Sequence, residues 1–393
     1  MSEKRILLVV NKFSYPPVDG GTAAVASLVD LLSKIGKVSV FTPDTPKNTV
    51  KNEISNIEVH SFPIDTEKNR KRFLFQQFFI PLQALQYIDE NGLSLFRRLV
   101  EEFVPDVIIT NTPFLSLLIE KSFPGLKYIL RSENIEYKIW EYRSEVSAEG
   151  FTEKIKFKVY SRIVRRYETK VWQKAEKILH ISQRELTEII QAIGNSQKVH
   201  YLPYAFPDTF FEQVKYIDYN DIPRLYFIGA FDWAPNFYSM VKFLSEEWEK
   251  IVTHFPSIQY IITGKKVELL RRYFGGRILK NVVLLDSPPS PIIVIKNSDI
   301  LLSPVKWGSG VSIKVLEALA AGRCVIATVE SARDIHIGRE CGLATYSTTD
   351  ELIEHLSFFI DKRIRRKAGE KAKEYMINNH SYRSVMPLLH SLL

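Results

Sequence analysis

Residues 308–328 read GSGVSIKVLEALAAGRCVIAT, and they decide the fold that we predict for this chain. They combine a glycine-rich turn, a helix expected to start near Ser312, and a strand that follows the helix. The apolar run at 299–304 is typical of a short buried strand, and the apolar residues of the helix recur on one face, as in a helix packed on a sheet. A glycine turn that opens a helix predicts a cradle for an anion.

The polar face of this helix carries Lys314 and Glu317, which are three positions apart and therefore neighbours. A cation in the first turn opposes the helix dipole by about 0.3–1 kcal/mol, and lysine before glutamate is the weaker order for an ion pair. A phosphate on the amides of Gly310, Val311 and Ser312 would compensate, because a helix N-terminus offers unpaired donors. Glu317 would then accept hydrogen bonds from a sugar hydroxyl. The alternative is a solvated ion pair beside an ordinary loop.

This run closely resembles the donor-site signature of retaining glycosyltransferases of the GT-B fold, family 4 type. The resemblance implies donor-binding roles for Gly308, Ser309, Gly310, Val311, Ser312, Lys314 and Glu317. Many of these enzymes carry a second glutamate, which would fall at Ser309 here. The chain is more similar to a subgroup that has a GxGxxxK-type turn in that place, so the resemblance leaves direct carboxylate contact with the transferred sugar open.

Length and composition favour two domains in a reducing compartment. A chain of 393 residues suits two domains of about 200 residues each. The resemblance implies an acceptor-binding domain at 1–204, a donor-binding domain at 205–376, and a helix at 377–393 that returns to the first domain. Cys324 and Cys341 have the spacing of neither a disulfide framework nor a zinc site, which suggests the cytoplasm. We expect neither a secretory signal nor a membrane span.

The first domain is expected to open with a strand at 5–11, a loop that ends in Asp19, Gly20 and Gly21, and a helix. The glycine pair is not the GxGxxG fingerprint of dinucleotide-binding folds. The resemblance implies that Gly20 and Gly21 border the cleft near the sugar and the diphosphate, while a tight turn without further function is the alternative. Further short strands at 38–41, 57–60, 106–110, 128–131, 178–182 and 199–202 predict an open α/β domain.

The segment SENIEY at 132–137 follows a predicted strand and therefore lies where ligands bind in open α/β sheets. It closely resembles the HNxEY segment of the same family, in which the histidine approaches the reacting sugar, but here that position is Glu133. An ionised carboxylate accepts hydrogen bonds and donates none. The resemblance implies an acceptor side formed by Arg131, Glu133, Asn134 and Glu136. The alternative is a helix cap that spans Ser132 to Glu136.

The second domain is expected to open with the strand 224–229 and the segment FIGAFDWAPN at 227–236, which resembles the corresponding opening of the same transferase subgroup. The arginine and lysine that usually contact phosphate in this segment of the family are absent here, and Lys265 is the candidate to replace them. The alternative is that Lys265 and Lys266 form an exposed loop pair.

The net charge of +8 leaves nucleic acid, anionic lipid and nucleotide phosphates as candidate partners. A basic and then aromatic segment is typical of membrane interfaces, with a core helix as the alternative. Its residues are Lys68, Arg70, Lys71, Arg72, Phe73 and Phe75. A second basic helix is expected at 153–177, where Phe157, Tyr160 and Tyr167 are interleaved with lysines and arginines. A solvated face is the favoured interpretation of that helix, with nucleic acid or lipid headgroups as the alternatives.

These observations predict two α/β domains, and the resemblance implies the GT-B fold, in which two Rossmann-like domains face each other across a cleft and a C-terminal helix crosses back. The resemblance implies a retaining glycosyltransferase of cell-surface polysaccharide biosynthesis, with Glu133, Lys314 and Glu317 as catalytic residues. A nucleotide-diphosphate sugar would be the co-substrate, without a further cofactor or metal, and a glycan or lipid-linked molecule the acceptor. We expect a cytoplasmic protein, which would bind peripherally to the inner face of the membrane if the basic and aromatic segment is a membrane-binding site.

Three other functions compete with this one. A nucleotide-sugar epimerase would need acids and bases around the sugar, and a catalytically weak lipid- or glycan-binding protein is favoured by Ser309 in place of a carboxylate. A nucleic-acid binder is least favoured, because the positive charge is scattered and no recognition motif accompanies it.

Overall fold

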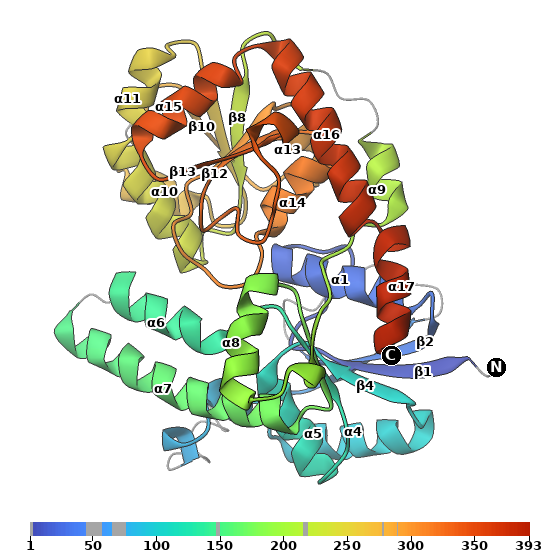
Figure 1. The fold of residues 1–393 in the computed structure, drawn as a ribbon. Helices are drawn as coiled ribbons and strands as arrows, with labels where there is room; N and C mark the ends of the chain where they lie inside the picture. The colour runs from blue at the N-terminus through green and yellow to red at the C-terminus, as the bar shows by residue number, and fades with distance from the viewer. Residues whose placement is uncertain are drawn as a thin grey trace. The chain divides into compact units, whose positions relative to one another are not determined.

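The computed structural model describes the chain except for residues 1–2, 45–56, 65–75, 147–149, 215–218, 277–278 and 289. Its contacts divide it into two units, Met1–Ala205 with Val385–Leu393 (unit 1) and Phe206–Ser384 (unit 2). In each unit, helices cover a parallel β-sheet (Figure 1).

Unit 1 is built on a seven-stranded sheet in the order β3-β2-β1-β4-β5-β6-β7, in which every pair is parallel. Its strands are β1 (Lys4–Val9), β2 (Gly36–Pro43), β3 (Ile57–Phe62), β4 (Val107–Thr110), β5 (Ile129–Ser132), β6 (Lys177–His180) and β7 (Val199–Tyr201). The central strands are continuous apolar runs because both faces of a parallel sheet are covered by helices. The sequence predicted all seven.

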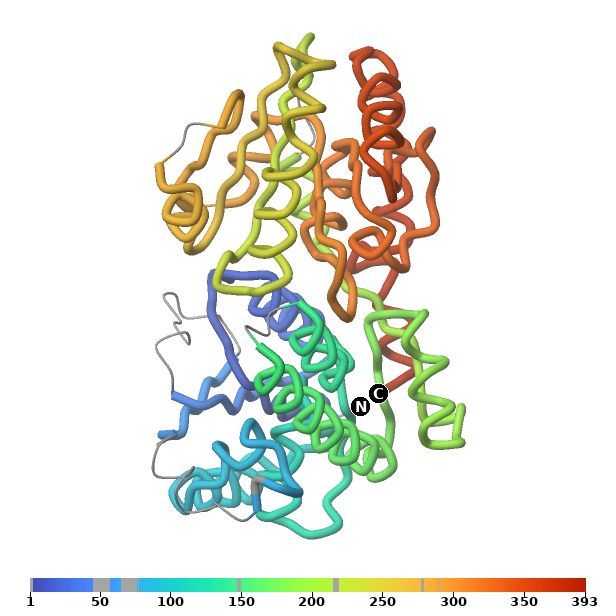
Figure 2. Tube along the Cα trace, turned by 90° about the vertical axis from the view of Figure 1, so that its left-hand side faces the viewer, coloured from blue at the N-terminus to red at the C-terminus, as the bar shows by residue number. Residues whose placement is uncertain are grey.

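The described helices of unit 1 are α1 (Gly20–Leu32), α3 (Leu82–Leu85), α4 (Glu90–Phe103), α5 (Ser116–Ser122), α6 (Glu136–Val146), α7 (Phe151–Lys174) and α8 (Gln183–Ile193). Short 3₁₀ turns are η1 (Gln76–Phe78), η2 (Pro113–Leu115) and η3 (Ser196–Lys198). Helices α6 and α7 lie side by side, as the ribbon and the Cα trace both show (Figures 1 and 2). The predicted basic helix at 153–177 is therefore α7, one half of a helical pair.

Unit 2 has a six-stranded parallel sheet in the order β10-β9-β8-β11-β12-β13. Its strands are β8 (Arg224–Ile228), β9 (Gln259–Thr263), β10 (Val282–Leu285), β11 (Ile300–Ser303), β12 (Cys324–Thr328) and β13 (Leu343–Tyr346). The chain winds from β8 toward β10 and then from β11 toward β13 on the other side. The loops after β8 and β11 therefore flank a topological switch point, which is where ligands bind in such sheets.

The helices of unit 2 are α9 (Asp208–Gln213), α10 (Ala234–Glu246), α11 (Trp248–His254), α12 (Glu268–Tyr273), α13 (Pro291–Lys296), α14 (Ile313–Ala320), α15 (Thr349–Phe358) and α16 (Lys362–His380), with the 3₁₀ turn η4 (Arg339–Cys341). Each unit has its own hydrophobic core. No described helix is both long enough and apolar enough to cross a membrane.

The chain returns to unit 1 within α17 (Tyr382–Leu392), because its contacts belong to unit 1 from Val385 onward. The predicted boundaries were 204/205 and 376/377. Helix α16 stays with unit 2 to its end, where the Phe206 amide donates to the His380 carbonyl at 2.7 Å and the Tyr382 amide donates to the Phe206 carbonyl at 2.9 Å. This short bridge holds the start of unit 2 beside the end of α16.

Candidate functional site

The glycine turn of unit 2 connects β11 to α14 as the sequence predicted. Gly308 has a φ of 149° and Gly310 a φ of 73°, in the region that favours glycine. Ser312 is the N-cap residue of α14, but its side chain makes no capping hydrogen bond. The start of α14 therefore carries a glycine turn and lacks a side-chain cap, as the predicted anion cradle requires.

Lys314 is held in place from within unit 2. Its Nζ donates to Asn236 Oδ1 at 2.9 Å and lies 4.6 Å from the centroid of the Phe227 ring. Burial lowers the pKa of Lys314 to about 8, although the charge of Glu317 acts in the opposite direction. Among the described residues no ion pair joins Lys314 to Glu317, so the interpretation of the two side chains as a solvated ion pair is wrong.

Glu317 lies one turn further along α14 and is also half-buried. Burial raises the pKa of its carboxyl to about 7, and the attraction of Lys314 offsets only part of this rise. An ammonium and a carboxylate are thus both poorly solvated beside an uncapped helix start. A ligand with a negative phosphate and sugar hydroxyls would supply what these two groups lack.

Asn236 connects the two loops at the switch point. It lies in the first turn of α10, where its Nδ2 donates to the Ala230 carbonyl at 2.8 Å while its Oδ1 accepts from Lys314. A Cβ added to Gly229 would lie 2.9 Å from Asn236 Nδ2 and 2.8 Å from the Phe227 ring, so only glycine leaves room for this arrangement. Asn236 was not predicted as a site residue from the sequence.

Lys265, the proposed phosphate partner, lies on the same sheet edge after β9. Its Nζ pairs with Asp232 at 2.7 Å, and both side chains are more than a third exposed. Its carbonyl accepts from the Phe231 amide at 2.8 Å, so the loops after β8 and β9 are joined. Its role in donor binding stays a prediction.

Arg333 supports the glycine turn from the loop after β12. Its Nη1 donates to the Gly308 carbonyl at 2.9 Å. The neighbouring Asp334 has a φ of 64°, an uncommon conformation for a residue other than glycine. Arg333 could not be predicted from the sequence, because nothing in the local pattern shows that its side chain reaches a residue 25 positions earlier.

In unit 1, the glycine pair lies inside the first turn of α1, which starts at Gly20, and not in the preceding loop as the sequence predicted. Asp19 caps this helix by accepting from the Thr22 amide at 2.8 Å, and the Lys12 Nζ donates to Asp19 at 3.0 Å. Burial raises the pKa of Asp19, but Lys12 and Thr22 outweigh it and lower that pKa. A Cβ on Gly21 would lie 2.5 Å from Lys12 Nζ. Lys12, which the sequence analysis also missed, therefore packs against the predicted glycine pair.

Glu133 follows β5 and shares the electrostatic field of the β1 loop. Burial raises the pKa of its carboxyl, Arg131 and Lys12 offset part of this rise, and Asp19 adds to it. The resulting pKa is about 7. Glu133 is thus a half-buried carboxyl that exchanges a proton near neutral pH. Such a group is suited to contact with an acceptor hydroxyl.

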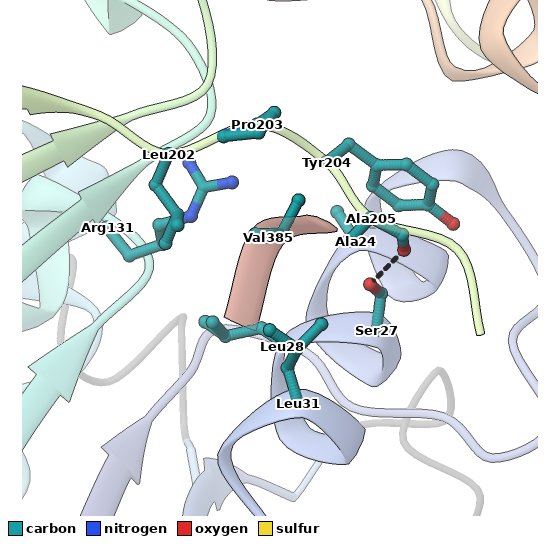
Figure 3. A pocket seen from close by; sticks show the side chains of 10 residues that line it. All are labelled: Ala24, Ser27, Leu28, Leu31, Arg131, Leu202, Pro203, Tyr204, Ala205 and Val385. Carbon is teal, nitrogen blue, oxygen red and sulfur yellow. Dashed lines mark hydrogen bonds between the residues drawn. The ribbon is translucent and has the colours of Figure 1, made fainter. Parts of the chain in front are cut away.

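Arg131, predicted for the acceptor side, is only 5% exposed. It lines a cavity of about 20 Å³ within unit 1, whose other walls include Ser27, Tyr204 and Val385 (Figure 3). A volume of this size accommodates about one water molecule. Burial lowers the pKa of Arg131 to about 10. The guanidinium therefore points into the body of unit 1, which favours a positioning role over contact with an acceptor.

The start of α6 is capped from α7. The amides of Glu136 and Tyr137 donate to the Glu168 carboxylate at 3.0 and 3.2 Å. Ser132 Oγ instead donates to the Asn134 carbonyl at 2.8 Å, so the alternative of a cap that spans Ser132 to Glu136 is wrong. Burial, followed by repulsion from Glu133, raises the pKa of Glu136 to about 7. The acceptor roles of Asn134 and Glu136 stay predictions.

Two further predictions concern a metal and a membrane. Among the described residues, no group of three His, Cys, Asp or Glu side chains is placed to hold a metal ion. The basic and aromatic segment proposed for the membrane lies outside the described residues, namely Lys68, Arg70, Lys71, Arg72, Phe73 and Phe75.

Comparison with known proteins agrees with this architecture. Residues 222–362 match the sequence model of a family described as "Glycosyl transferases group 1". No curated protein matches the sequence.

Several solved structures are similar over nearly the whole chain. Sucrose-phosphate synthase from Thermosynechococcus elongatus shares 14% identity over 99% of this chain and 98% of that chain, with a TM-score of 0.68. WaaG, a glycosyltransferase involved in lipopolysaccharide biosynthesis, shares 14% identity over 98% and 99%, with a TM-score of 0.64. Anabaena HepE in complex with UDP-glucose shares 13% identity over 99% and 100%, with a TM-score of 0.65. These similarities establish the fold.

Proposed function

We propose that this chain, a glycosyltransferase with the GT-B fold and a group 1 domain at residues 222–362, moves a sugar from a nucleotide-diphosphate donor to a glycan or lipid-linked acceptor. The observation that carries the proposal is the half-buried Lys314, with its lowered pKa, in the first turn of α14, a helix whose start has no side-chain cap. We place the reaction in cell-surface polysaccharide biosynthesis and the protein in the cytoplasm.

The donor is proposed to bind unit 2 through its diphosphate. Phosphate oxygens would accept from the amides at the start of α14 and from Lys314, which are donors of the kind that bind phosphate in many folds. Glu317 would accept from a hydroxyl of the donor. The complex of HepE with UDP-glucose supports a nucleotide sugar as the ligand class.

The transfer is proposed to retain the configuration at the anomeric carbon. The bond between that carbon and the leaving phosphate oxygen breaks, and the acceptor oxygen bonds to the carbon on the same face. The departing diphosphate takes the proton of the acceptor hydroxyl, so no protein nucleophile is needed. Lys314 and the helix amides stabilise the charge that grows on the diphosphate, and they can do so without a metal ion.

Glu133 is proposed to act on the acceptor. With a pKa of about 7 it can accept a hydrogen bond from a hydroxyl or attract an amino group at neutral pH. It replaces the histidine of the resembling family and cannot donate hydrogen bonds when it is ionised. Glu133→Gln would keep the size of the side chain, add a donor and remove the charge, and we expect it to lower transfer while leaving donor binding intact.

The experiment that tests the donor site is thermal protection by a panel of nucleoside diphosphates and their sugars. A ligand that binds only the folded state raises the melting temperature by mass action. We expect one nucleotide to protect the wild type, and Lys314→Ala and Glu317→Ala to lose that protection. Lys367→Ala on the exposed face of α16 is the matched control and should keep it.

Absence of protection by every nucleotide in well-folded protein would contradict the donor site. It would favour the lipid- or glycan-binding protein that Ser309, in place of a carboxylate, suggests. Protection that survives in both alanine variants would show that the nucleotide binds elsewhere.

A further inference from the structure

The outer face of α7 in unit 1 carries a row of exposed apolar side chains. Phe151, Ile155 and Val159 are 78%, 46% and 48% exposed, and their spacing of four residues places them on one side of the helix. Val146, the last residue of α6, is also exposed. The end of α6 and the start of α7 lie together at the tip of the helical pair (Figure 1). The apolar row therefore begins at that tip.

Dense positive charge accompanies the row. The basic residues of α7 are Lys154, Lys156, Lys158, Arg162, Arg165, Arg166, Lys170 and Lys174. Its acidic residues are Glu153 and Glu168. Glu168 is buried and accepts hydrogen bonds from two backbone amides of α6. Within the described part of the chain, no ion pair joins Lys154, Lys158 or Arg162 to a carboxylate. The face is therefore strongly cationic.

The aromatic residues that suggested nucleic-acid binding face inward. The rings of Phe157 and Tyr160 lie 5.9 and 4.6 Å from the Trp140 ring of α6, and Tyr167 is buried. Sequence-tolerant binding of single strands depends on exposed aromatic platforms on which bases stack. In the exposed row only Phe151 is aromatic, and the aliphatic Ile155 and Val159 beside it offer no succession of platforms on which bases could stack.

We propose that this face docks on an anionic lipid surface through Phe151, Lys154, Ile155, Lys158, Val159 and Arg162. In this arrangement the apolar row enters the boundary between headgroups and acyl chains, and the basic side chains beside it reach anionic headgroups. Their long aliphatic stems allow the charges to stay in the headgroup layer. The charge on the face selects anionic over zwitterionic lipid.

A neighbouring segment adds exposed apolar surface near α7. Phe78 and Phe79 are 65% and 79% exposed. Three residues later, the Leu82 amide donates to the Tyr160 hydroxyl at 2.8 Å, which ties this part of the chain to α7. The docking surface differs from the one predicted from sequence at 68–75, and it does not depend on the donor chemistry of unit 2.

The test is flotation of the full chain with vesicles of phosphatidylcholine alone or mixed with phosphatidylglycerol. We expect binding to the anionic vesicles, and we expect it to weaken as salt screens the charges. Phe151→Ser with Ile155→Ser, and separately Lys154→Glu with Lys158→Glu, should each lower the partition coefficient by about tenfold.

The matched control reverses the same charge elsewhere. Lys367→Glu with Lys371→Glu changes two exposed lysines of α16, a basic helix in unit 2, and should leave vesicle binding within about twofold of wild type, because the proposed docking face lies entirely in unit 1. All the substituted side chains are exposed, so thermal unfolding of each variant should match wild type. The double serine variant and the double glutamate variant change different side chains. If one of them fails to fold, the other still tests the proposal.

Three results would overturn the proposal. Equal binding to vesicles with and without phosphatidylglycerol would remove the role of charge. Equal loss in the α7 and α16 charge variants would show that any surface lysine suffices. Binding of a single-stranded RNA or of an acidic protein without binding to anionic vesicles would assign the face to another kind of partner.

Discussion

Replacing Glu317 by glutamine should stabilise the unliganded protein at alkaline pH while weakening the proposed site. Burial raises the pKa of this carboxyl from 4.5 to about 7. The difference, 7 − 4.5 = 2.5, corresponds to about 3.4 kcal/mol of unfavourable free energy for the ionised carboxylate, at about 1.36 kcal/mol per pKa unit. The side chain is only half-buried, so solvent screening reduces this to about 1–2 kcal/mol.

The sign of the pH dependence follows from proton binding. Between pH 4.5 and about 7 the folded state holds a proton on Glu317 that the unfolded state has lost, so the contribution of this group to stability falls as the pH rises through that window. Glutamine resembles the protonated acid at every pH. We therefore expect Glu317→Gln to equal wild type near pH 4.5 and to exceed it by about 1–2 kcal/mol above pH 7.

The assay is chemical unfolding of the unliganded chain at about pH 5 and about pH 8. Glu374→Gln, at an exposed position of α16, should stay within about 0.5 kcal/mol of wild type at both values. In a coupled transfer assay the Glu317→Gln variant should lose about tenfold or more in rate, because an ionised acceptor makes stronger hydrogen bonds than a neutral one. A variant less stable than wild type at pH 8, or equally stabilised at both pH values, would refute the assignment of Glu317 to a poorly solvated site.

The remaining predictions concern the same edge of unit 2. Donor affinity should fall by about tenfold per pH unit above the Lys314 pKa of about 8, because the ammonium loses its proton. Lys314→Arg should abolish that fall, because arginine stays charged. Isothermal titration calorimetry of the two proteins across this pH range measures both effects. Asn236→Leu should raise the KM for the donor by about tenfold, because it removes the oxygen that accepts from Lys314. Asn236→Asp should raise the pKa of Lys314 and so move the loss of activity at alkaline pH to a higher pH. Gly264→Ala should destabilise unit 2 by about 2–4 kcal/mol in thermal unfolding, since the φ of Gly264 is 134° and the new Cβ would lie 1.9 Å from the Gly229 carbonyl oxygen. Gly194→Ala is the control: Gly194 also has a positive φ but has open space around it, so the change should cost only about 1–2 kcal/mol.

Local patterns in the sequence predicted the elements that carry the site. The strand, glycine turn and helix around residues 308–320 follow from apolar periodicity and glycine spacing, and the structure confirms them. The short strand β13 was missed, because the four residues LATY carry too little periodic signal to stand out from a loop.

The partners of the site residues could not be predicted in the same way. Asn236 reaches Lys314 across 78 positions, and Glu168 caps α6 across about 32. Such contacts arise when the sheet brings the ends of different strands to one edge, and the sequence near either residue carries no mark of the other. The environment that lowers the pKa of Lys314 is therefore a property of the tertiary fold.

The return of residues 385–393 to unit 1 has a consequence for the order in which the protein is made. Unit 2 is one continuous stretch inserted into unit 1, and it can close its core as soon as residue 384 has left the ribosome. Unit 1 at that moment still lacks Val385 and Leu389, two buried side chains of its interior. Although unit 1 is synthesised first, it is completed last, because it cannot bury these two side chains until all of unit 2 has been made.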